Sequence, residues 1–149
     1  MNGPAARPAP ATGGCLCGAV HFSVPGAFVS ARACWCRLCQ YIGAGGATVN
    51  ALYSSDGFDV IGETRDFVSV ADSGTVMHRF FCPTCGTHLY GTAESRPHIV
   101  VVRVGALDDP ATAPPASTIW TAEAPGWACF DPALPSLDGQ PAPPPAPRA

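Results

Sequence analysis

The middle of the chain alternates short apolar, β-branched runs with turns rich in glycine and acidic residues. Apolar residues that recur at every second position over four to eight residues predict half-buried strands. The run Ile99–Val104 is the most apolar of these, which predicts a central strand of a sheet. The predicted strands are Ala19–Val24, Ala47–Tyr53, Phe58–Ile61, Asp66–Ala71, Thr75–Phe81, His88–Gly91 and Ile99–Val104.

Only one helix is predicted, a turn or two over Arg37–Ile42 that ends at Gly43. Strands that follow one another through short turns, with so little helix, predict an all-β fold built mainly from antiparallel sheet. The prolines support this placement of the sheet. Of 17 prolines, only Pro83 and Pro97 lie between Ala27 and Asp109, and proline cannot donate a hydrogen bond to a strand ladder.

The two ends of the chain differ from its middle. Residues 1–13 are mostly alanine, proline and glycine, and are expected to be disordered. The tail, residues 138–149, reads DGQPAPPPAPRA and predicts a disordered, extended chain of polyproline type. Since 149 residues suit one domain, we expect a single domain over residues 14–137.

Charge and hydropathy exclude several classes of partner. Charged residues make up 13% of the chain, the net charge is −3, and the basic residues are eight scattered arginines. Duplex nucleic acid needs a clustered basic face, so no nucleic acid partner is expected. No run approaches the ~18 apolar residues that cross a bilayer, and the N-terminus lacks the apolar core of a signal peptide. No membrane association and a cytoplasmic location are therefore expected, where clustered cysteines bind metal or react rather than form disulfides.

Seven of the eight cysteines fall into three tight groups: Cys15 and Cys17; Cys34, Cys36 and Cys39; and Cys82 and Cys85. A tight turn aims neighbouring sulfurs at one point, and structural zinc takes four such ligands. The Cys82 pair needs two more ligands, which either the Cys15 pair or two members of the Cys34 group can supply. We favour the Cys15 pair, because the Cys34 group is then left intact. Cys129 stands alone and is expected to be a buried thiol.

The three-cysteine group differs from a structural site in the number of its ligands. Four protein ligands make a zinc site structural, whereas three leave one position open. No histidine lies within the Cys34–Cys39 turn, so the fourth ligand is an external group or a distant side chain. Zinc bound by three thiolates is a poor Lewis acid but a suitable place for a thiolate that must stay nucleophilic. A second structural site, closed by a histidine, remains the alternative.

These motifs, taken together and in this order, resemble those of the glutathione-dependent formaldehyde-activating enzyme family, which includes centromere protein V. The resemblance rests on Gly14–Gly18 (GCLCG), the Cys34 group and Phe81–Thr87 (FCPTCGT), and covers about residues 14–137. The C-terminal elements that also look similar are Val104–Pro110, Ile119-Trp120, Trp127 and Leu134-Pro135. One position departs from the pattern, because Trp35 stands where many members carry histidine.

The resemblance implies a fold, two metal sites and a reaction. The fold is a β-tent, whose antiparallel sheets are joined by a structural zinc on Cys15, Cys17, Cys82 and Cys85. Cys34, Cys36 and Cys39 would hold a second, more labile zinc with a catalytic role. The implied activity is that of a carbon–sulfur lyase that joins glutathione, a small-molecule thiol, to formaldehyde as S-hydroxymethylglutathione. The alternative is a non-catalytic zinc module that binds a protein partner.

Overall fold

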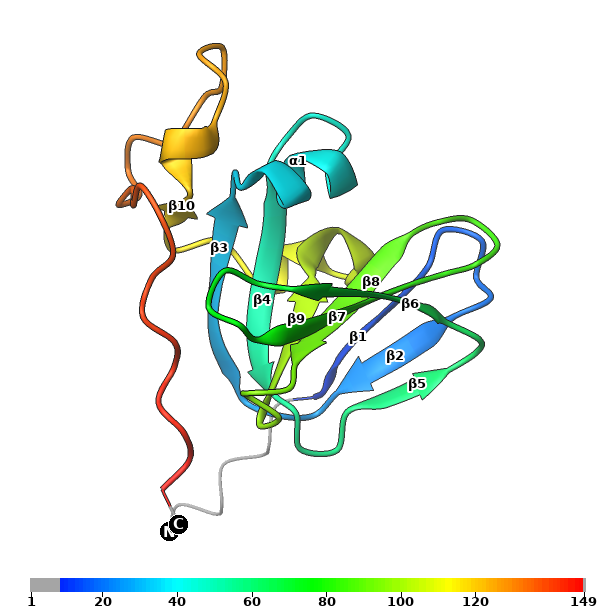
Figure 1. The fold of residues 1–149 in the computed structure, drawn as a ribbon. Helices are drawn as coiled ribbons and strands as arrows, with labels where there is room; N and C mark the ends of the chain where they lie inside the picture. The colour runs from blue at the N-terminus through cyan, green and yellow to red at the C-terminus, as the bar shows by residue number, and fades with distance from the viewer. Residues whose placement is uncertain (1–8, 149) are drawn as a thin grey trace, which may run out of the picture.

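The computed structural model describes residues 9–148, which form two β-sheets and little helix (Figure 1). The smaller sheet has three antiparallel strands in the order β1-β2-β5. Its strands are β1 (Ala11–Gly14), β2 (His21–Val24) and β5 (Asp59–Ile61). Within residues 9–148, the single α-helix, α1 (Arg37–Ile42), follows the first strand of the larger sheet along the chain. Three 3-10 turns lie at Val104–Ala106 (η1), Pro110–Thr112 (η2) and Thr121–Glu123 (η3).

The larger sheet has seven strands in the order β10-β3-β4-β9-β8-β7-β6. All neighbours pair antiparallel except β10 and β3, which are parallel. The sheet is strongly curled: in Figure 1, β3 and β4 run upright whereas β6 and β7 run across. Its strands are β3 (Phe28–Cys34), β4 (Thr48–Ser54), β6 (Arg65–Val70), β7 (Val76–Phe81), β8 (His88–Ala93), β9 (Ile99–Arg103) and β10 (Thr118–Ile119).

The hydrophobic core fills the space between the two sheets. Phe22 and Val24 of β2 are fully buried and belong to one cluster with Ala51 of β4 and Val100 and Val102 of β9. Because side chains alternate along a strand, the intervening residues of β4 and β9 point to the opposite side of the large sheet. Residues on that opposite side are free to build a site without disturbing the core.

The predicted all-β architecture is confirmed, as is its mainly antiparallel character. All seven predicted strands exist with ends shifted by one or two residues, and β9 is the fourth of seven strands, as expected of the most apolar run. Helix α1 has the predicted bounds, and the N–H of Gly43 caps it by donating to the carbonyl of Cys39. Strands β1, β3 and β10 were not predicted.

Strand β1 lies in the segment for which the sequence predicts disorder, so that prediction is wrong from Ala11 onward; residues 1–8 lie outside the described part. The strand exists because Gly13 permits close packing. A Cβ atom at Gly13 would lie 2.2 Å from the carbonyl oxygen of Ala106 and 2.4 Å from the ring of Phe22. The glycine that makes this run look unstructured is therefore what allows it to pack.

The C-terminal tail is anchored before it extends. Thr118 of β10 bridges Ser136, the Trp120 amide donates to the Gly139 carbonyl at 3.4 Å, and the Trp120 indole donates to Gln140 at 2.9 Å. Residues 141–148 then contain neither helix nor strand. Across residues 9–148, no helix has the length and hydropathy needed to span a bilayer.

Candidate metal centres

The first cysteine cluster joins the two sheets. Cys15 and Cys17 lie in the turn between β1 and β2, and Cys82 and Cys85 lie in the turn between β7 and β8. Their four sulfur atoms lie within 4.8 Å of one another, with 3.5 Å between Cys15 and Cys17 and 3.7 Å between Cys17 and Cys82. The structure therefore brings Cys15 and Cys17, and not members of the Cys34 group, next to the Cys82 pair.

Thr87 connects the two turns of this cluster and was not anticipated from the sequence. Its hydroxyl oxygen accepts a hydrogen bond from the Leu16 amide at 3.2 Å, so its own proton is free to be donated to Cys85 Sγ, 3.1 Å away. Hydrogen bonds from the side chain and then the backbone of Thr87 lower the pKa of Cys85 to about 5. Thr87 thus favours a thiolate at Cys85, the form that binds metal.

The second cluster is formed by Cys34, Cys36 and Cys39, whose sulfurs also lie within 4.8 Å of one another. Cys34 is the last residue of β3, Cys36 caps α1 by accepting the Cys39 amide on its sulfur at 3.4 Å, and Cys39 is in the first turn of the helix. Cys34 and Cys39 are buried. The β3–α1 junction thus aims three sulfurs inward at one point.

The three thiols of this cluster do not ionise equally. Hydrogen bonds from the side chains of Cys34 and Cys36 lower the pKa of Cys39 to about 2, and Thr48 and the charge of Arg103 act in the same direction. The same contacts with Cys36 and Cys39, together with burial, raise the pKa of Cys34. Three neighbouring thiolates repel one another, so a cation is needed before all three can be charged.

Both donor sets fit zinc. A tetrahedral zinc ion with sulfur ligands at ~2.3 Å requires sulfurs roughly 3.8 Å apart. The 3.5 and 3.7 Å separations in the first cluster agree with this value, and the sulfurs of the second cluster, all within 4.8 Å of one another, are compatible with it. Each cluster could therefore hold a metal ion. Among the described residues, four ligand atoms gather at the first centre and three at the second, with no nearby His, Asp or Glu completing the latter.

A polar surface surrounds the second cluster on the side of the large sheet opposite the core, which we call the site face. Thr48 and Asn50 of β4 are buried there, and Arg103 of β9 is paired in register with Asn50. Arg103 Nη1 donates to Asn50 Oδ1 and to Thr48 Oγ1 at 3.4 Å. Thr48 in turn interacts with Cys39, so a short polar chain links Arg103 to the cluster.

The C-terminal loop packs against Trp35, which lies between Cys34 and Cys36 in the chain. Trp35 is buried, and its ring meets those of Trp127 and Phe130 edge-on, with centroids 6.2 and 6.0 Å away. Trp127 itself is 70% exposed, so it is a wall rather than core. Cys129, in the same loop, is exposed. The prediction of a buried thiol at Cys129 is therefore wrong, because this loop pairs with no strand and lies on the surface.

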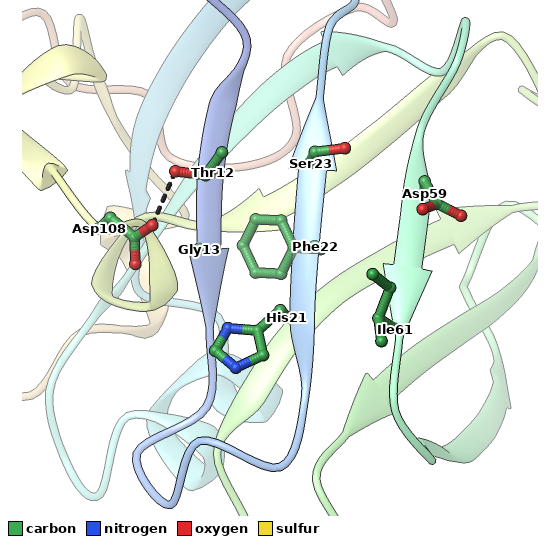
Figure 2. A pocket seen from close by; sticks show the side chains of 8 residues that line it. All are labelled: Thr12, Gly13, His21, Phe22, Ser23, Asp59, Ile61 and Asp108. Atoms are coloured by element: carbon green, nitrogen blue, oxygen red, sulfur yellow. Dashed lines mark hydrogen bonds between the residues drawn. The ribbon is translucent and has the colours of Figure 1, made fainter.

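Two of the pockets on the described part of the chain bear on where a ligand could bind. One, of about 340 Å³, lies on the three-stranded sheet, where His21 and Ser23 of β2 face it and Thr12 is already bonded to Asp108 at 2.7 Å (Figure 2). No clustered cysteine lines it. The other, of about 280 Å³, has an apolar wall and lies between α1 and the large sheet; it is lined by Leu38, Tyr41, Ile42, Phe67 and His88. Helix α1, which carries Cys39, therefore forms one wall of this second pocket.

The chain is similar to one protein family in sequence and to a solved structure in fold. Residues 10–123 match the family model described as glutathione-dependent formaldehyde-activating enzyme. Among solved structures, the fold is similar to the crystal structure of a Rhodobacter sphaeroides protein, with a TM-score of 0.51 and 25% sequence identity. That match covers 65% of this chain and 87% of the other. All seven clustered cysteines lie within residues 10–123, the part that matches the family model.

Proposed function

Because the chain belongs to the family of glutathione-dependent formaldehyde-activating enzymes, we propose that it acts on the adduct of glutathione, or another small thiol, with formaldehyde or another small aldehyde. The reaction class would be that of a carbon–sulfur lyase. The observation that carries this proposal is the three-sulfur cluster of Cys34, Cys36 and Cys39, which gathers one ligand fewer than a closed zinc site.

The two clusters would have different roles. Zinc on Cys15, Cys17, Cys82 and Cys85 would hold the two sheets together. Zinc on Cys34, Cys36 and Cys39 would be more labile, and when bound it supplies an open position that favours the thiolate form of a substrate thiol.

The protein's own groups prepare the second site for this chemistry. The Cys36 sulfur caps α1 and so fixes the helix that carries Cys39. The charge of Arg103 favours anionic sulfur beside it. Trp35 lies between Cys34 and Cys36 in the chain and packs against Trp127 and Phe130, which would give the site an apolar side where a thiolate is less solvated and therefore more nucleophilic.

Cobalt substitution tests this proposal. Cobalt bound to thiolates absorbs through sulfur-to-metal charge transfer, so an additional thiolate changes the spectrum. We expect glutathione to change the spectrum of the cobalt-loaded protein and S-methylglutathione, whose sulfur cannot ionise, to leave it unchanged. Cys39→Ser should abolish the response. Formaldehyde consumption with glutathione should also exceed the uncatalysed rate in proportion to protein. A spectrum indifferent to glutathione and to other small thiols would contradict the proposal.

A non-catalytic module that binds a protein is the second candidate. Strand β6 is the outer strand of the large sheet, and its side chains Phe67, Val68 and Val70 are all more than half exposed. Exposed apolar edges of this kind pair with other chains. A cobalt spectrum that shows four protein ligands at the Cys34, Cys36 and Cys39 centre before any thiol is added, obtained as the difference from the Cys39→Ser spectrum, would favour this candidate.

A further inference from the structure

Arg103 reaches the three-cysteine cluster with part of its donor capacity unused. Its Nη1 bonds to neutral oxygens of Asn50 and Thr48, while its Nε is buried and has no hydrogen-bond partner among the described residues. An arginine presents five donors in a planar fork, and a buried donor left unpaired is unfavourable. The side chain is thus positioned for an acceptor that the protein itself does not provide.

Arg79 lies on the same face as Arg103. Its neighbour Phe80 packs against the core, so by alternation Arg79 points to the site face. It is half-buried and donates to Ser69 Oγ at 2.5 Å. Burial and the charge of Arg103 lower the pKa of Arg79, while the three cysteines act in the opposite direction. The two guanidinium groups and the sulfurs are therefore within electrostatic reach of one another.

A third arginine adds to the positive charge of this face. Arg32 is two residues before Cys34 on β3, so the two side chains share the site face. Burial and the charge of Arg96 lower the pKa of Arg32, and Cys34 raises it. Among the described residues, ion pairs are made only by His78, with Asp66 and Glu94. None of the three arginines has a carboxylate partner.

The charges on the site face do not balance without a ligand. Three thiolates and one zinc ion carry a single net negative charge, against which the three arginines bring positive charge in excess. An incoming thiolate offsets part of the excess and leaves room for one further anionic group. Buried charges that lack partners are costly, and the planar arginine fork matches the two oxygens of a carboxylate.

We propose that Arg79 and Arg103 bind a carboxylate of the thiol substrate and so make the site selective for thiols that carry one. The proposal rests on the proposed function for the sulfur of that substrate. The apolar pocket supplies space for the remainder of the molecule, because Phe67, which lines it, is the cross-strand partner of Arg79. Arg79 and Arg103 then orient the substrate so that its sulfur meets the three-cysteine cluster.

The test compares thiols with and without a carboxylate. Binding of 3-mercaptopropionate and of 2-mercaptoethanol to the zinc-loaded full chain is measured by calorimetry. The proteins compared are the native chain, Arg79→Met, Arg103→Met and the control Arg148→Met, which changes an exposed arginine of the C-terminal tail. Hydrogen bonds to charged groups contribute enough free energy that each site variant should lower the affinity for 3-mercaptopropionate roughly tenfold or more. Both should leave the affinity for 2-mercaptoethanol within about threefold, since that thiol has no carboxylate for an arginine to hold. Arg148→Met should change the affinity for neither thiol.

The outcomes separate this proposal from the proposed function. If both thiols lose affinity equally, the carboxylate proposal is wrong, since the arginines would then serve only to neutralise the cysteines. Unchanged binding of 3-mercaptopropionate would also contradict it. S-methylglutathione, which has carboxylates but no free thiol, tests the subsite without the sulfur. If no thiol binds but S-methylglutathione binds in an Arg79-dependent way, the subsite stands and the proposed function fails. If neither binds, both fail. Arg79→Met, at a half-buried position, decides the matter if Arg103→Met does not fold.

Discussion

His78 lies between two carboxylates on the surface of the large sheet. Its Nδ1 is 2.6 Å from Asp66 Oδ2 and its Nε2 is 3.0 Å from Glu94 Oε1. The hydrogen bonds with Asp66 and then Glu94 raise the pKa of His78 above its usual 6.5. The imidazolium therefore connects β6, β7 and the end of β8, in a structural role rather than as a metal ligand.

This arrangement predicts a pH-dependent contribution to stability. A pKa that is higher in the folded than in the unfolded state contributes stability that is fully present below the unfolded value of 6.5 and is lost as pH rises through the raised folded value. We expect the difference in unfolding free energy between the native protein and His78→Gln to be largest near pH 6 and to shrink steadily toward alkaline pH. Urea denaturation of both proteins over this range measures it. A difference that grows with pH would contradict the assignment.

Single residues also mark the limit of prediction from sequence. The clustered cysteines can be found because ligands for one metal recur at short spacing, as at Cys34, Cys36 and Cys39. Arg103 on β9 and Arg79 on β7 belong to the same site face, but they lie two and four strands away from Cys34 on β3. Only the strand register brings them together. The one available signal was that Arg103 is the sole charge within the most apolar run, Ile99–Val104.

At the scale of elements, helix α1 depends on one buried amide. The Gln40 side chain donates to the carbonyls of Trp35 at 2.7 Å and Glu123 at 3.0 Å, so it connects the helix to both the preceding loop and η3. The Glu123 carboxylate in turn accepts a hydrogen bond from the backbone amide of Arg37, at the start of the helix, at 2.6 Å. A helix of six residues has little stability of its own, and these bonds hold it over the second cluster.

Gln40→Ala should therefore loosen the second site. The substitution leaves two carbonyls without donors and opens a small void, which costs about 1–3 kcal/mol of unfolding free energy. Urea denaturation at fixed zinc measures the loss. Gln140→Ala, which removes one exposed hydrogen bond with Trp120, is the control and should change stability by less than about 0.5 kcal/mol. If the two variants behave alike, Gln40 does not anchor the helix.

The elements that the sequence did not predict lack local patterns. Strand β3 reads FVSARAC, in which small and charged residues hide the alternation; its pairing with β4 is what makes it a strand. Strand β1 contains two glycines, and β10 is only two residues long. In each case tertiary pairing overrides weak local preference. The seven predicted strands, by contrast, are rich in β-branched and aromatic residues, so they can be recognised from their local sequence.

At the scale of the whole molecule, we expect zinc on the four-cysteine cluster to hold the two sheets together. Cys82 is completely buried and belongs to the main core. Zinc binding in small zinc-folded peptides has an apparent free energy of ~10–16 kcal/mol, comparable with the ~5–15 kcal/mol stability of an entire domain. Binding free energy at this centre is therefore also folding free energy.

Two serine variants should consequently have different outcomes. Cys82→Ser is expected to unfold or aggregate, whereas Cys39→Ser should stay folded with about one zinc ion in place of about two. Circular dichroism and zinc analysis by mass spectrometry measure both properties. Cys129→Ser, at an exposed position in the C-terminal loop, should match the native protein. If Cys82→Ser and Cys39→Ser both keep all their metal and stability, the assignment of the two centres is wrong.

The sequence separation of the cysteines also determines the order in which the two centres are completed during synthesis. Cys17 and Cys82 are 65 positions apart, and a ribosome adds ~5–20 residues per second. The first cysteine pair therefore waits several seconds for its partners, with its thiols open to oxidants. The Cys34 group lies within one turn of chain and is complete as soon as it emerges. We expect the nascent chain to capture metal first at the three-cysteine centre and last at the four-cysteine centre.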